Sequence, residues 1–217
     1  MPQEFRYPSR TIIRLLKLTA LIISKVFWFI RYEGLDNIPR SGDRGLIIAS
    51  NHQTYIDPVW ISIPIRQKQR FMAFDGAFSW RLVGPLITYL GAFPVKTPVD
   101  TGTAFIKTSL RALSEGAALV IFPEGSRESA DGKMMPFKEG TMRIALRTGL
   151  PVLPVTIVGG ERIWPYGRRY PRIFRRVNVI FHPAYTPENA ISDQAATEEL
   201  ARAIASAYDD KRPAANI

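Results

Sequence analysis

The chain has 217 residues, no cysteine and a formal net charge of +10. A chain of this length can bury one sizeable hydrophobic core, so we expect a single domain. Without cysteine, a disulfide framework, a thiolate zinc site and a cysteine nucleophile are all excluded. The positive charge favours polyanionic partners, which include nucleic acids, anionic membranes and phosphorylated substrates, and does not choose among them.

The N-terminal segment from Thr11 to Ile30 is largely apolar, but Arg14, Lys17 and Lys25 interrupt it. A helix that spans a membrane needs about 20 apolar residues with few charges, so we do not expect a simple span. On a helical wheel, the basic residues fall within an arc of roughly 120°. They are Arg10, Arg14, Lys17, Lys25 and Arg31.

This arrangement predicts an amphipathic helix that lies in the plane of the lipid headgroups, with its cations against anionic lipid. The aromatic cluster of Phe27, Trp28 and Phe29 is typical of the membrane interface. Two alternatives stay open, namely a helix that packs on the core and a short re-entrant insertion.

The rest of the chain alternates between strand-like and helix-like segments. Short apolar runs predict strands at 45–50, 71–74, 92–96, 118–122, 152–158 and 177–181. Helices are predicted within 80–90 and at 103–113, 141–147 and 195–208. Another helix should begin at Asp57-Pro58, with Asp57 as its N-cap and Pro58 as its first residue.

Strands that alternate with helices predict an α/β domain with a largely parallel central sheet flanked by helices. We therefore divide the chain into an N-terminal membrane-associated helical segment, residues 1–35, and an α/β domain, residues 36–217.

Two polar clusters directly follow buried strands of the predicted sheet. The first is NHQTYID at residues 51–57, and the second is PEGSR at residues 123–127. In parallel α/β sheets, ligands bind at the carboxyl ends of the strands. We therefore expect a polar site where these two clusters meet.

His52 and Asp57 are the candidates for proton transfer in the first cluster. If His52 lies on the loop and Asp57 begins the next helix, the loop can fold the carboxylate back onto the imidazole. A carboxylate on one ring nitrogen fixes the tautomer and leaves the other nitrogen free to accept a proton. A histidine that satisfies buried backbone groups beside a helix-capping aspartate is the alternative.

No G-x-S-x-G motif supplies a serine nucleophile, because Ser126 in EGSRES lacks the flanking glycine pattern. Since cysteine is also absent, the simplest chemistry uses a hydroxyl of the substrate as the nucleophile. A general base would activate that hydroxyl, and the hydroxyl would then attack a reactive acyl donor such as a thioester.

Four segments together resemble the 1-acyl-sn-glycerol-3-phosphate acyltransferase family, the glycerolipid acyltransferases. NHQTYID matches the N-H-x-x-x-x-D motif, and FPEGSRES resembles F-P-E-G-[TS]-R-S, although Glu128 precedes Ser129. PFKEG at residues 136–140 resembles P-F-K-x-G, and LPV at residues 153–155 resembles the V-[IV]-P-V strand. Their order and spacing also agree, so the resemblance covers residues 45–158.

The resemblance implies an enzyme that moves a fatty acyl group from acyl-CoA or acyl carrier protein to the free hydroxyl of a lysophospholipid. The implied acceptor is 1-acyl-sn-glycerol-3-phosphate, which would become phosphatidic acid. His52 is then the base and Asp57 orients it. The acceptor-binding residues would be Glu124, Gly125, Ser126, Arg127 and Lys138. No cofactor and no metal are implied.

One departure from the family bears on the acceptor. Where the family carries an arginine after the middle helix, this chain has Thr97, and Lys96 stands one residue earlier. Successive residues of a strand point to opposite faces, so Lys96 is a poor substitute. A lysolipid with another head group therefore stays open as the acceptor.

The basic, aromatic-rich stretch Trp164–Arg176 allows three interpretations: a solvated loop, a contact with anionic membrane, and a docking patch for acyl carrier protein or coenzyme A.

His182 is interpreted as a structural residue at the end of a strand. A non-catalytic basic protein that binds lipid or nucleic acid is the competing function. No nucleic acid partner is expected, because no signature of a nucleic-acid-binding fold is present. We expect a peripheral or monotopic protein on the cytoplasmic face of the cell membrane.

Overall fold

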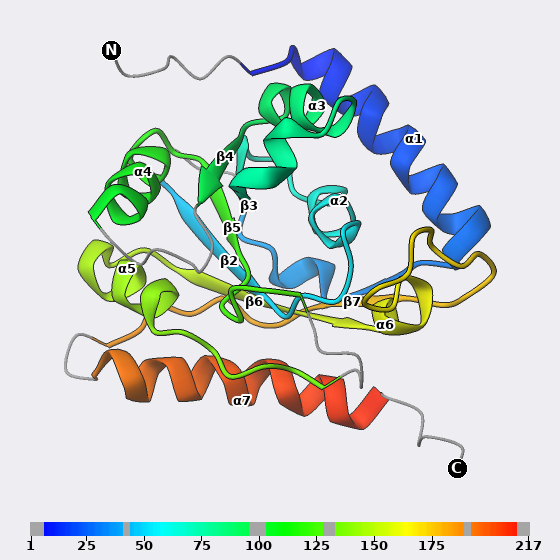
Figure 1. The fold of residues 1–217 in the computed structure, drawn as a ribbon. Helices are drawn as coiled ribbons and strands as arrows, with labels where there is room; N and C mark the ends of the chain where they lie inside the picture. The colour runs from blue at the N-terminus through cyan, green and yellow to red at the C-terminus, as the bar shows by residue number, and fades with distance from the viewer. Residues whose placement is uncertain (1–6, 41–43, 96–102, 128–132, 189–191, 212–217) are drawn as a thin grey trace.

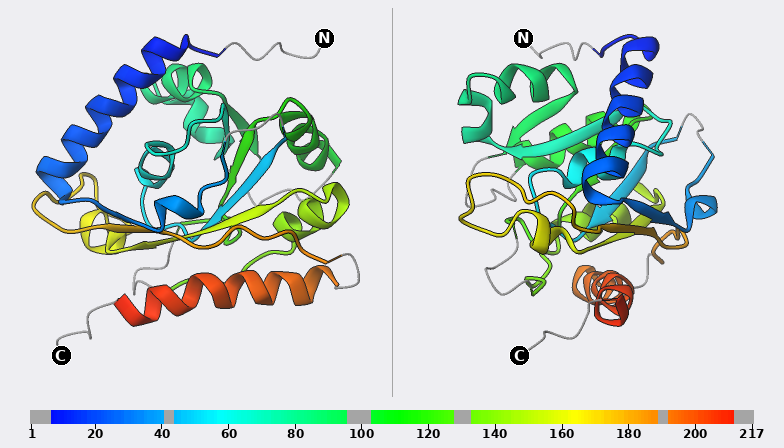
Figure 2. Two further views of the ribbon diagram at one scale, coloured as in Figure 1. Left: turned by 180° about the vertical axis from the view of Figure 1, so that it is seen from behind. Right: turned by 90° about the vertical axis from the view of Figure 1, so that its right-hand side faces the viewer.

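The computed structural model describes residues 7–40, 44–95, 103–127, 133–188 and 192–211. One seven-stranded sheet lies at the centre, with helices on both of its faces (Figures 1 and 2). In spatial order, its strands are β1 (Arg31–Glu33), β7 (Asn178–Phe181), β6 (Val152–Val158), β2 (Leu46–Ser50), β5 (Ala118–Ile121), β3 (Gln69–Phe74) and β4 (Ala92–Val95). The five strands from β6 to β4 are parallel, whereas β7 is antiparallel to β6 and parallel to β1. The predicted largely parallel α/β sheet is confirmed.

The central strands are buried on both faces, which explains why they read as continuous apolar runs. In β2, Leu46 and Ile48 belong to the hydrophobic core on one face of the sheet. Ile47 and Ala49 belong to the core on the other face. This alternation follows from the two-residue period of a strand.

The helices divide between the two faces of the sheet. They are α1 (Arg10–Trp28), α2 (Asp57–Ser62), α3 (Val83–Tyr89), α4 (Thr103–Ser114), α5 (Gly140–Thr148), α6 (Gly160–Ile163) and α7 (Asp193–Lys211). Core residues from α2 and α6 lie on one face together with residues of α1, and those of α4, α5 and α7 lie on the other. All five helices predicted after the N-terminal segment are confirmed. The sequence did not indicate α6, the strand β1 or the short 3-10 helices η1 (Leu35–Asn37) and η2 (Asp75–Ser79).

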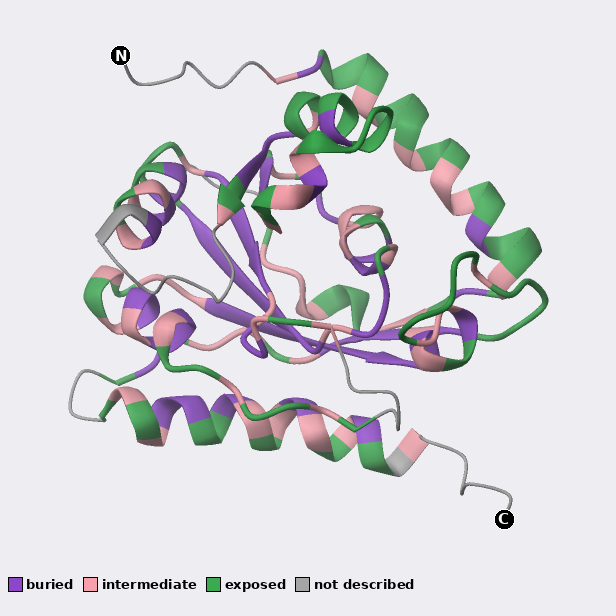
Figure 3. Ribbon diagram, in the orientation of Figure 1, coloured by how far each residue is buried: buried purple, intermediate pink, exposed green. Residues whose placement is uncertain are grey.

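Helix α1 lies at the outside of the molecule and turns most of its apolar side chains to the surface (Figures 1 and 3). The exposed apolar side chains are Ile12, Leu15, Leu16, Leu18, Ile22, Ile23, Val26 and Phe27. On its inner side, Ser24 is buried and accepts a hydrogen bond from Trp60 Nε1 of α2 at 3.2 Å. Among the described residues, no helix combines the length and apolar character that crossing a membrane requires.

Three details of the predicted helix are wrong. Lys17 does not face lipid: its ammonium donates to the Ile65 carbonyl oxygen, and burial lowers its pKa to about 8. Arg31 is not on the helix, because α1 ends at Trp28 and Arg31 begins β1. Trp28 packs inward, with its ring centroid 5.8 Å from that of Trp60. The side of the helix that carries Lys17 and Trp28 is thus the side that packs on the domain.

Candidate active site

The two predicted polar clusters lie side by side because β2 and β5 are parallel neighbours in the sheet. Ile48 of β2 pairs with Val120 of β5, so both strands end at the same edge. Beyond that edge, the backbone N–H of His52 donates to Glu124 Oε1 at 2.8 Å. The expected meeting of the clusters is confirmed.

Asp57 is fully buried and holds the loop that precedes it. Its Oδ2 atom accepts hydrogen bonds from the backbone N–H groups of Gln53 at 2.6 Å and Thr54 at 2.7 Å. Its Oδ1 atom accepts from the Thr54 hydroxyl at 2.7 Å. The prediction that Asp57 is an N-cap is wrong, because Ile56 occupies that position and no side chain caps α2. The loop turns its own N–H groups toward the carboxylate, which therefore points away from the helix.

The same carboxylate also holds the imidazole of His52. The His52 Nδ1 atom lies 2.9 Å from Asp57 Oδ2, and the side chain of His52 is 18% exposed. The ring stacks on Phe122, with the centroids 4.0 Å apart and an interplanar angle of 18°. Within the described part of the chain, nothing hydrogen-bonds to Nε2. The carboxylate therefore sets the tautomer of the imidazole and leaves Nε2 to accept a proton, as a general base requires.

Glu124 is a buried carboxylate that joins two loops. Its Oε1 atom accepts from His52 N, and its Oε2 atom accepts from Met135 N at 2.8 Å. Burial raises the pKa of Glu124 to about 7, against the lowering effect of these two hydrogen bonds. Glu124 thus fixes the backbone of His52 to the segment that contains Met135.

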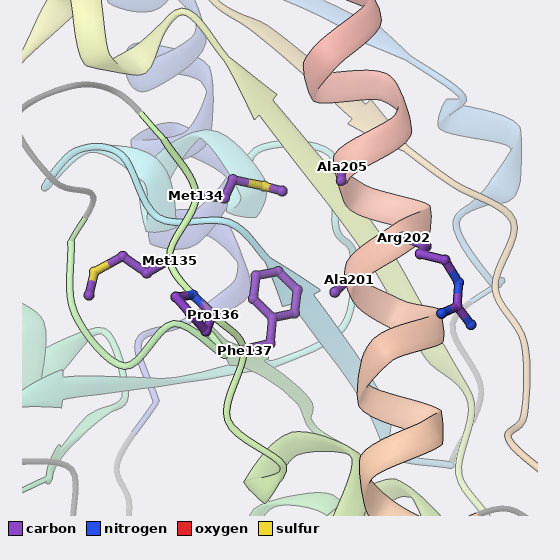
Figure 4. Close-up of a pocket in the computed structure, with 7 residues that line it drawn as sticks. All are labelled: Met134, Met135, Pro136, Phe137, Ala201, Arg202 and Ala205. Carbon is purple, nitrogen blue, oxygen red and sulfur yellow. The ribbon is translucent and has the colours of Figure 1, made fainter.

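The segment around Met135 is held in turn by α7. Phe137 and Met134 pack against the hydrophobic core that α7 helps to form. Figure 4 shows these two side chains directed toward α7, across a groove of about 340 Å³, whereas Met135 points away. On that other side, the Ser126 hydroxyl lies 3.2 Å from Met135 Sδ. Met134 and Phe137 point to one side of the segment and Met135 points to the other (Figure 4). One short segment therefore contacts both the core and the loop after β5.

A cationic group lies on the loop after β5. The Arg127 guanidinium lies over the ring of Tyr55, 3.6 Å from its centroid, and 5.5 Å from that of Tyr166. Gly125 has a positive φ of 72°, and a Cβ there would lie 2.6 Å from the ammonium of Lys138. The structure therefore brings together the predicted substrate residues Glu124, Gly125, Ser126, Arg127 and Lys138. Lys96, Thr97, Glu128 and Ser129 lie outside the described residues.

A model of the acyltransferase family matches residues 29–158 of this chain. The chain belongs to the acyltransferase family. The matched range begins one residue after α1 and ends with β6. It therefore contains both polar loops and Lys138, and it leaves out α1 and α7.

Several 1-acyl-sn-glycerol-3-phosphate acyltransferases are similar in sequence over most of this chain. A chloroplastic 1-acyl-sn-glycerol-3-phosphate acyltransferase of Brassica napus, BAT2, is 34% identical over 175 residues, which are 78% of this chain and 49% of that protein. The 1-acyl-sn-glycerol-3-phosphate acyltransferase of Bacillus subtilis is 31% identical over 137 residues, 61% of this chain and 66% of its own length. The chain spans about half the length of the plant relatives that it matches.

The fold is also similar to that of a solved member of the acyltransferase family. The crystal structure of the 1-acyl-sn-glycerophosphate acyltransferase PlsC from Thermotoga maritima superposes with a TM-score of 0.75 at 25% identity. The match covers 93% of this chain and 81% of the other. Because the family model matches only residues 29–158, the structural likeness also includes residues outside that model.

Sequence reasoning assigned no role to two buried residues of this candidate site, Asn51 and Gln53. The Asn51 side chain donates to the Ile157 carbonyl at 2.8 Å and accepts from Ile157 N at 2.7 Å. The Gln53 side chain accepts from Gly160 N at 2.8 Å. Both residues tie the histidine loop to the end of β6. Amides within a motif that follows a buried strand are the one signal that could have indicated this.

His182 follows β7, as predicted, and is not part of the candidate active site. Its Nε2 atom lies 2.8 Å from the hydroxyl of Thr156 in β6. Burial lowers the pKa of His182. In the described part of the chain, no group of three or more His, Asp or Glu side chains is placed to hold a metal ion.

Proposed function

We propose that this chain transfers a fatty acyl group from a thioester to the free hydroxyl of a lysophospholipid, with 1-acyl-sn-glycerol-3-phosphate as the acceptor and phosphatidic acid as the product. The observation that carries the proposal is the imidazole of His52, which Asp57 holds at 2.9 Å while Nε2 stays accessible beside a cationic loop. The names of the similar acyltransferases support the same reaction class.

The proposed reaction needs only one base from the protein. Nε2 of His52 takes the proton of the acceptor hydroxyl, and the oxygen attacks the carbonyl carbon of the thioester. A C–O ester bond forms and the C–S bond breaks. The proton then passes from the imidazolium to the leaving thiolate. Asp57 keeps Nδ1 protonated throughout and offsets the charge of the imidazolium.

Arg127 and Lys138 are proposed to bind the phosphate of the acceptor. A guanidinium can make two parallel charged hydrogen bonds to a phosphate, and an ammonium adds a second cation. Gly125 lets the ammonium of Lys138 approach the backbone, and Ser126 offers an exposed hydroxyl. Glu124 remains part of the proposed acceptor site. Because it accepts a hydrogen bond from His52 N, it also acts as a positioning residue.

The direct test is an assay of the purified chain with detergent or vesicles. Lysophosphatidic acid and lysophosphatidylcholine are offered as acceptors, and acyl-CoA and acyl carrier protein thioesters as donors. Masses of the products identify both substrates together. We expect phosphatidic acid from lysophosphatidic acid, with at least one of the donors. If no acceptor gains an acyl group while the folded chain binds vesicles, the proposed function is wrong.

Replacing Tyr55 with leucine is expected to raise KM for lysophosphatidic acid about threefold, with little change in kcat. The ring of Tyr55 supports the Arg127 guanidinium, and an exposed cation–π contact contributes about 0.5–1 kcal/mol. Tyr55→Phe keeps the ring and should keep the KM of the unmodified chain. Steady-state kinetics of both variants test this. Equal effects of leucine and phenylalanine would contradict it.

We propose that residues 1–35 form a membrane-associated segment next to the acyltransferase domain of residues 36–217, and that α1 lies on the cytoplasmic face of the cell membrane as a peripheral or monotopic element. The support is the row of exposed apolar side chains along α1, which includes Leu15 at 60% exposure. Apolar groups of this kind insert at the boundary between headgroups and acyl chains.

The double substitution Leu18→Glu with Ile22→Glu is expected to weaken binding to phosphatidylcholine vesicles about a hundredfold or more. Each of these side chains is 54% exposed, so covering the exposed part contributes about 1 kcal/mol, and a glutamate in its place adds the larger penalty of bringing a charge out of water. Vesicle sedimentation measures the binding, and thermal unfolding should change little. The control, Gln194→Glu with Ser206→Glu, adds the same charge on α7, on the opposite side of the molecule (Figures 1 and 2). Equal loss in both variants contradicts the proposed role of α1.

A further inference from the structure

A cationic cavity lies at the end of α1, apart from the site of His52. It has a volume of about 410 Å³ and is lined by Phe29, Arg162, Phe174, Arg176, Asn178 and Lys211. These residues come from the end of α1, from α6, from the basic stretch 164–176, from the first residue of β7 and from the last residue of α7. Those ends come together on one side of the molecule (Figure 1). No residue of the candidate active site lines this cavity.

The cavity carries an excess of positive charge. Lys211 pairs with Glu33, and Arg162 lies 3.6 Å from Glu161. Among the described residues, no carboxylate lies within 4.0 Å of the third cation, Arg176. Two guanidinium groups and an ammonium that approach one cavity from separate segments form a setting that suits a phosphate group.

The rim of the cavity is aromatic and exposed. Phe29 is 46% exposed and Phe174 is 58% exposed, with their ring centroids 6.4 Å apart. Phe27 of α1 lies 6.3 Å from Phe174 in the same way. The rim therefore continues the exposed apolar side of α1. If that side enters a bilayer, the cations beneath the rings come to the level of the lipid phosphates.

The backbone at this rim is held in a strained conformation. In the described part of the chain, Phe29 and Phe174 are the two residues other than glycine with a positive φ, at 43° and 57°. A bulky residue in this region costs on the order of 1–3 kcal/mol and persists only where the surroundings hold it, commonly at ligand sites. Here Phe174 N donates to the Phe27 carbonyl at 2.6 Å, and Val177 N donates to that of Trp28 at 3.2 Å. The rim is therefore fixed to the end of α1 by backbone hydrogen bonds.

We propose that this cavity binds the phosphate head group of a resident anionic phospholipid of the bilayer, a molecule distinct from the substrate. Arg162 and Arg176 hold the phosphate, and the rings of Phe29 and Phe174 enter the boundary with the acyl chains. Such binding would set how the mouth of the active site is oriented on the membrane. The proposal rests on the membrane association proposed above, and it gives one part of the basic stretch 164–176 a specific ligand.

Vesicle sedimentation of the full chain tests the proposal with phosphatidylcholine alone and with added phosphatidylglycerol. Arg162→Gln with Arg176→Gln should lose the gain in affinity that phosphatidylglycerol gives. The matched control, Arg168→Gln with Arg169→Gln, removes the same amount of charge from the basic stretch 164–176, outside the cavity. We call these two variants the cavity pair and the control pair. We expect the cavity pair to bind vesicles with phosphatidylglycerol about tenfold more weakly than the control pair, because each direct charged hydrogen bond adds to the general electrostatic attraction.

Three outcomes would overturn the proposal. Equal losses in the two pairs would mean that the surface acts only through its general charge. Unchanged binding of Arg162→Lys with Arg176→Lys would mean that the guanidinium geometry is not used. Thermal stabilisation by inorganic phosphate or coenzyme A, seen in the unmodified chain and absent from the cavity pair, would mean that the ligand is a soluble phosphate. If α1 does not bind membranes at all, the unmodified chain will not bind phosphatidylcholine vesicles either. If only the cavity proposal is wrong, that binding remains. The Arg162→Gln with Arg176→Gln variant should retain it as well.

Discussion

Replacing His52 with alanine is expected to lower kcat about a thousandfold or more, with little change in the KM values of either substrate. General base catalysis contributes about 10² to 10⁴ in rate, and no other imidazole lies at this edge of the sheet in the described residues. The imidazole is partly exposed and its main packing contact is Phe122. The variant should therefore fold and bind vesicles as the unmodified chain does. Initial rates with saturating donor and acceptor measure the effect.

The companion variant Asp57→Asn should lower kcat less than the alanine variant does, because the imidazole remains although its tautomer is no longer set. This variant should also lower the free energy of unfolding. Three backbone or hydroxyl groups besides the imidazole donate to the buried carboxylate, and an amide cannot accept from all of them. Turnover by the alanine variant within tenfold of the unmodified chain would contradict a base role for His52.

The sheet could be predicted from the sequence because its signal is local. The runs at 46–49 and at Ala118–Ile121 are continuously apolar and short, which is the pattern of a strand buried on both faces. The meeting of the two polar loops followed from the same reasoning, since parallel strands end at one edge. The family motifs then identified which loop residues to examine.

What could not be predicted depends on where the chain packs, which periodicity does not report. The cations of α1 indicated a polar face toward lipid, yet Lys17 meets the carbonyl of Ile65, a contact 48 residues along the chain. Asp57-Pro58 indicated a helix cap, because the local pattern cannot show that the preceding loop turns its N–H groups back to the carboxylate. Asn51 and Gln53 bond to residues more than 100 positions away.

The stability of the chain is expected to fall between pH 4.5 and pH 8 because of Glu124. Burial raises the pKa of this carboxyl from 4.5 to about 7 in the folded state. A raised pKa means that the folded state holds the proton more tightly than the unfolded state. The resulting stabilisation is complete below about pH 4.5 and is lost as the pH rises through about 7. Its size is on the order of 3 kcal/mol, since one pKa unit corresponds to about 1.4 kcal/mol.

The variant Glu124→Gln isolates this contribution because glutamine does not ionise. Denaturant unfolding at a series of pH values should show that the unmodified chain loses about 3 kcal/mol relative to the variant as the pH rises. The control Glu198→Gln makes the same chemical change on the exposed surface of α7. A flat difference for Glu124→Gln would mean that water solvates the carboxylate.

The Glu124 carboxylate destabilises the fold above pH 7, and we expect its hydrogen bonds to serve the position of His52. Both oxygens of Glu124 accept backbone N–H groups, one of them from His52. Glutamine has a single carbonyl oxygen, so one of these N–H groups must face an amide nitrogen, at a cost of about 1–3 kcal/mol at every pH. The variant should therefore be the less stable protein at low pH. At pH 8 it should be no less stable than the unmodified chain, and it should nevertheless turn over more slowly. A normal kcat at that pH would show that His52 is placed without Glu124.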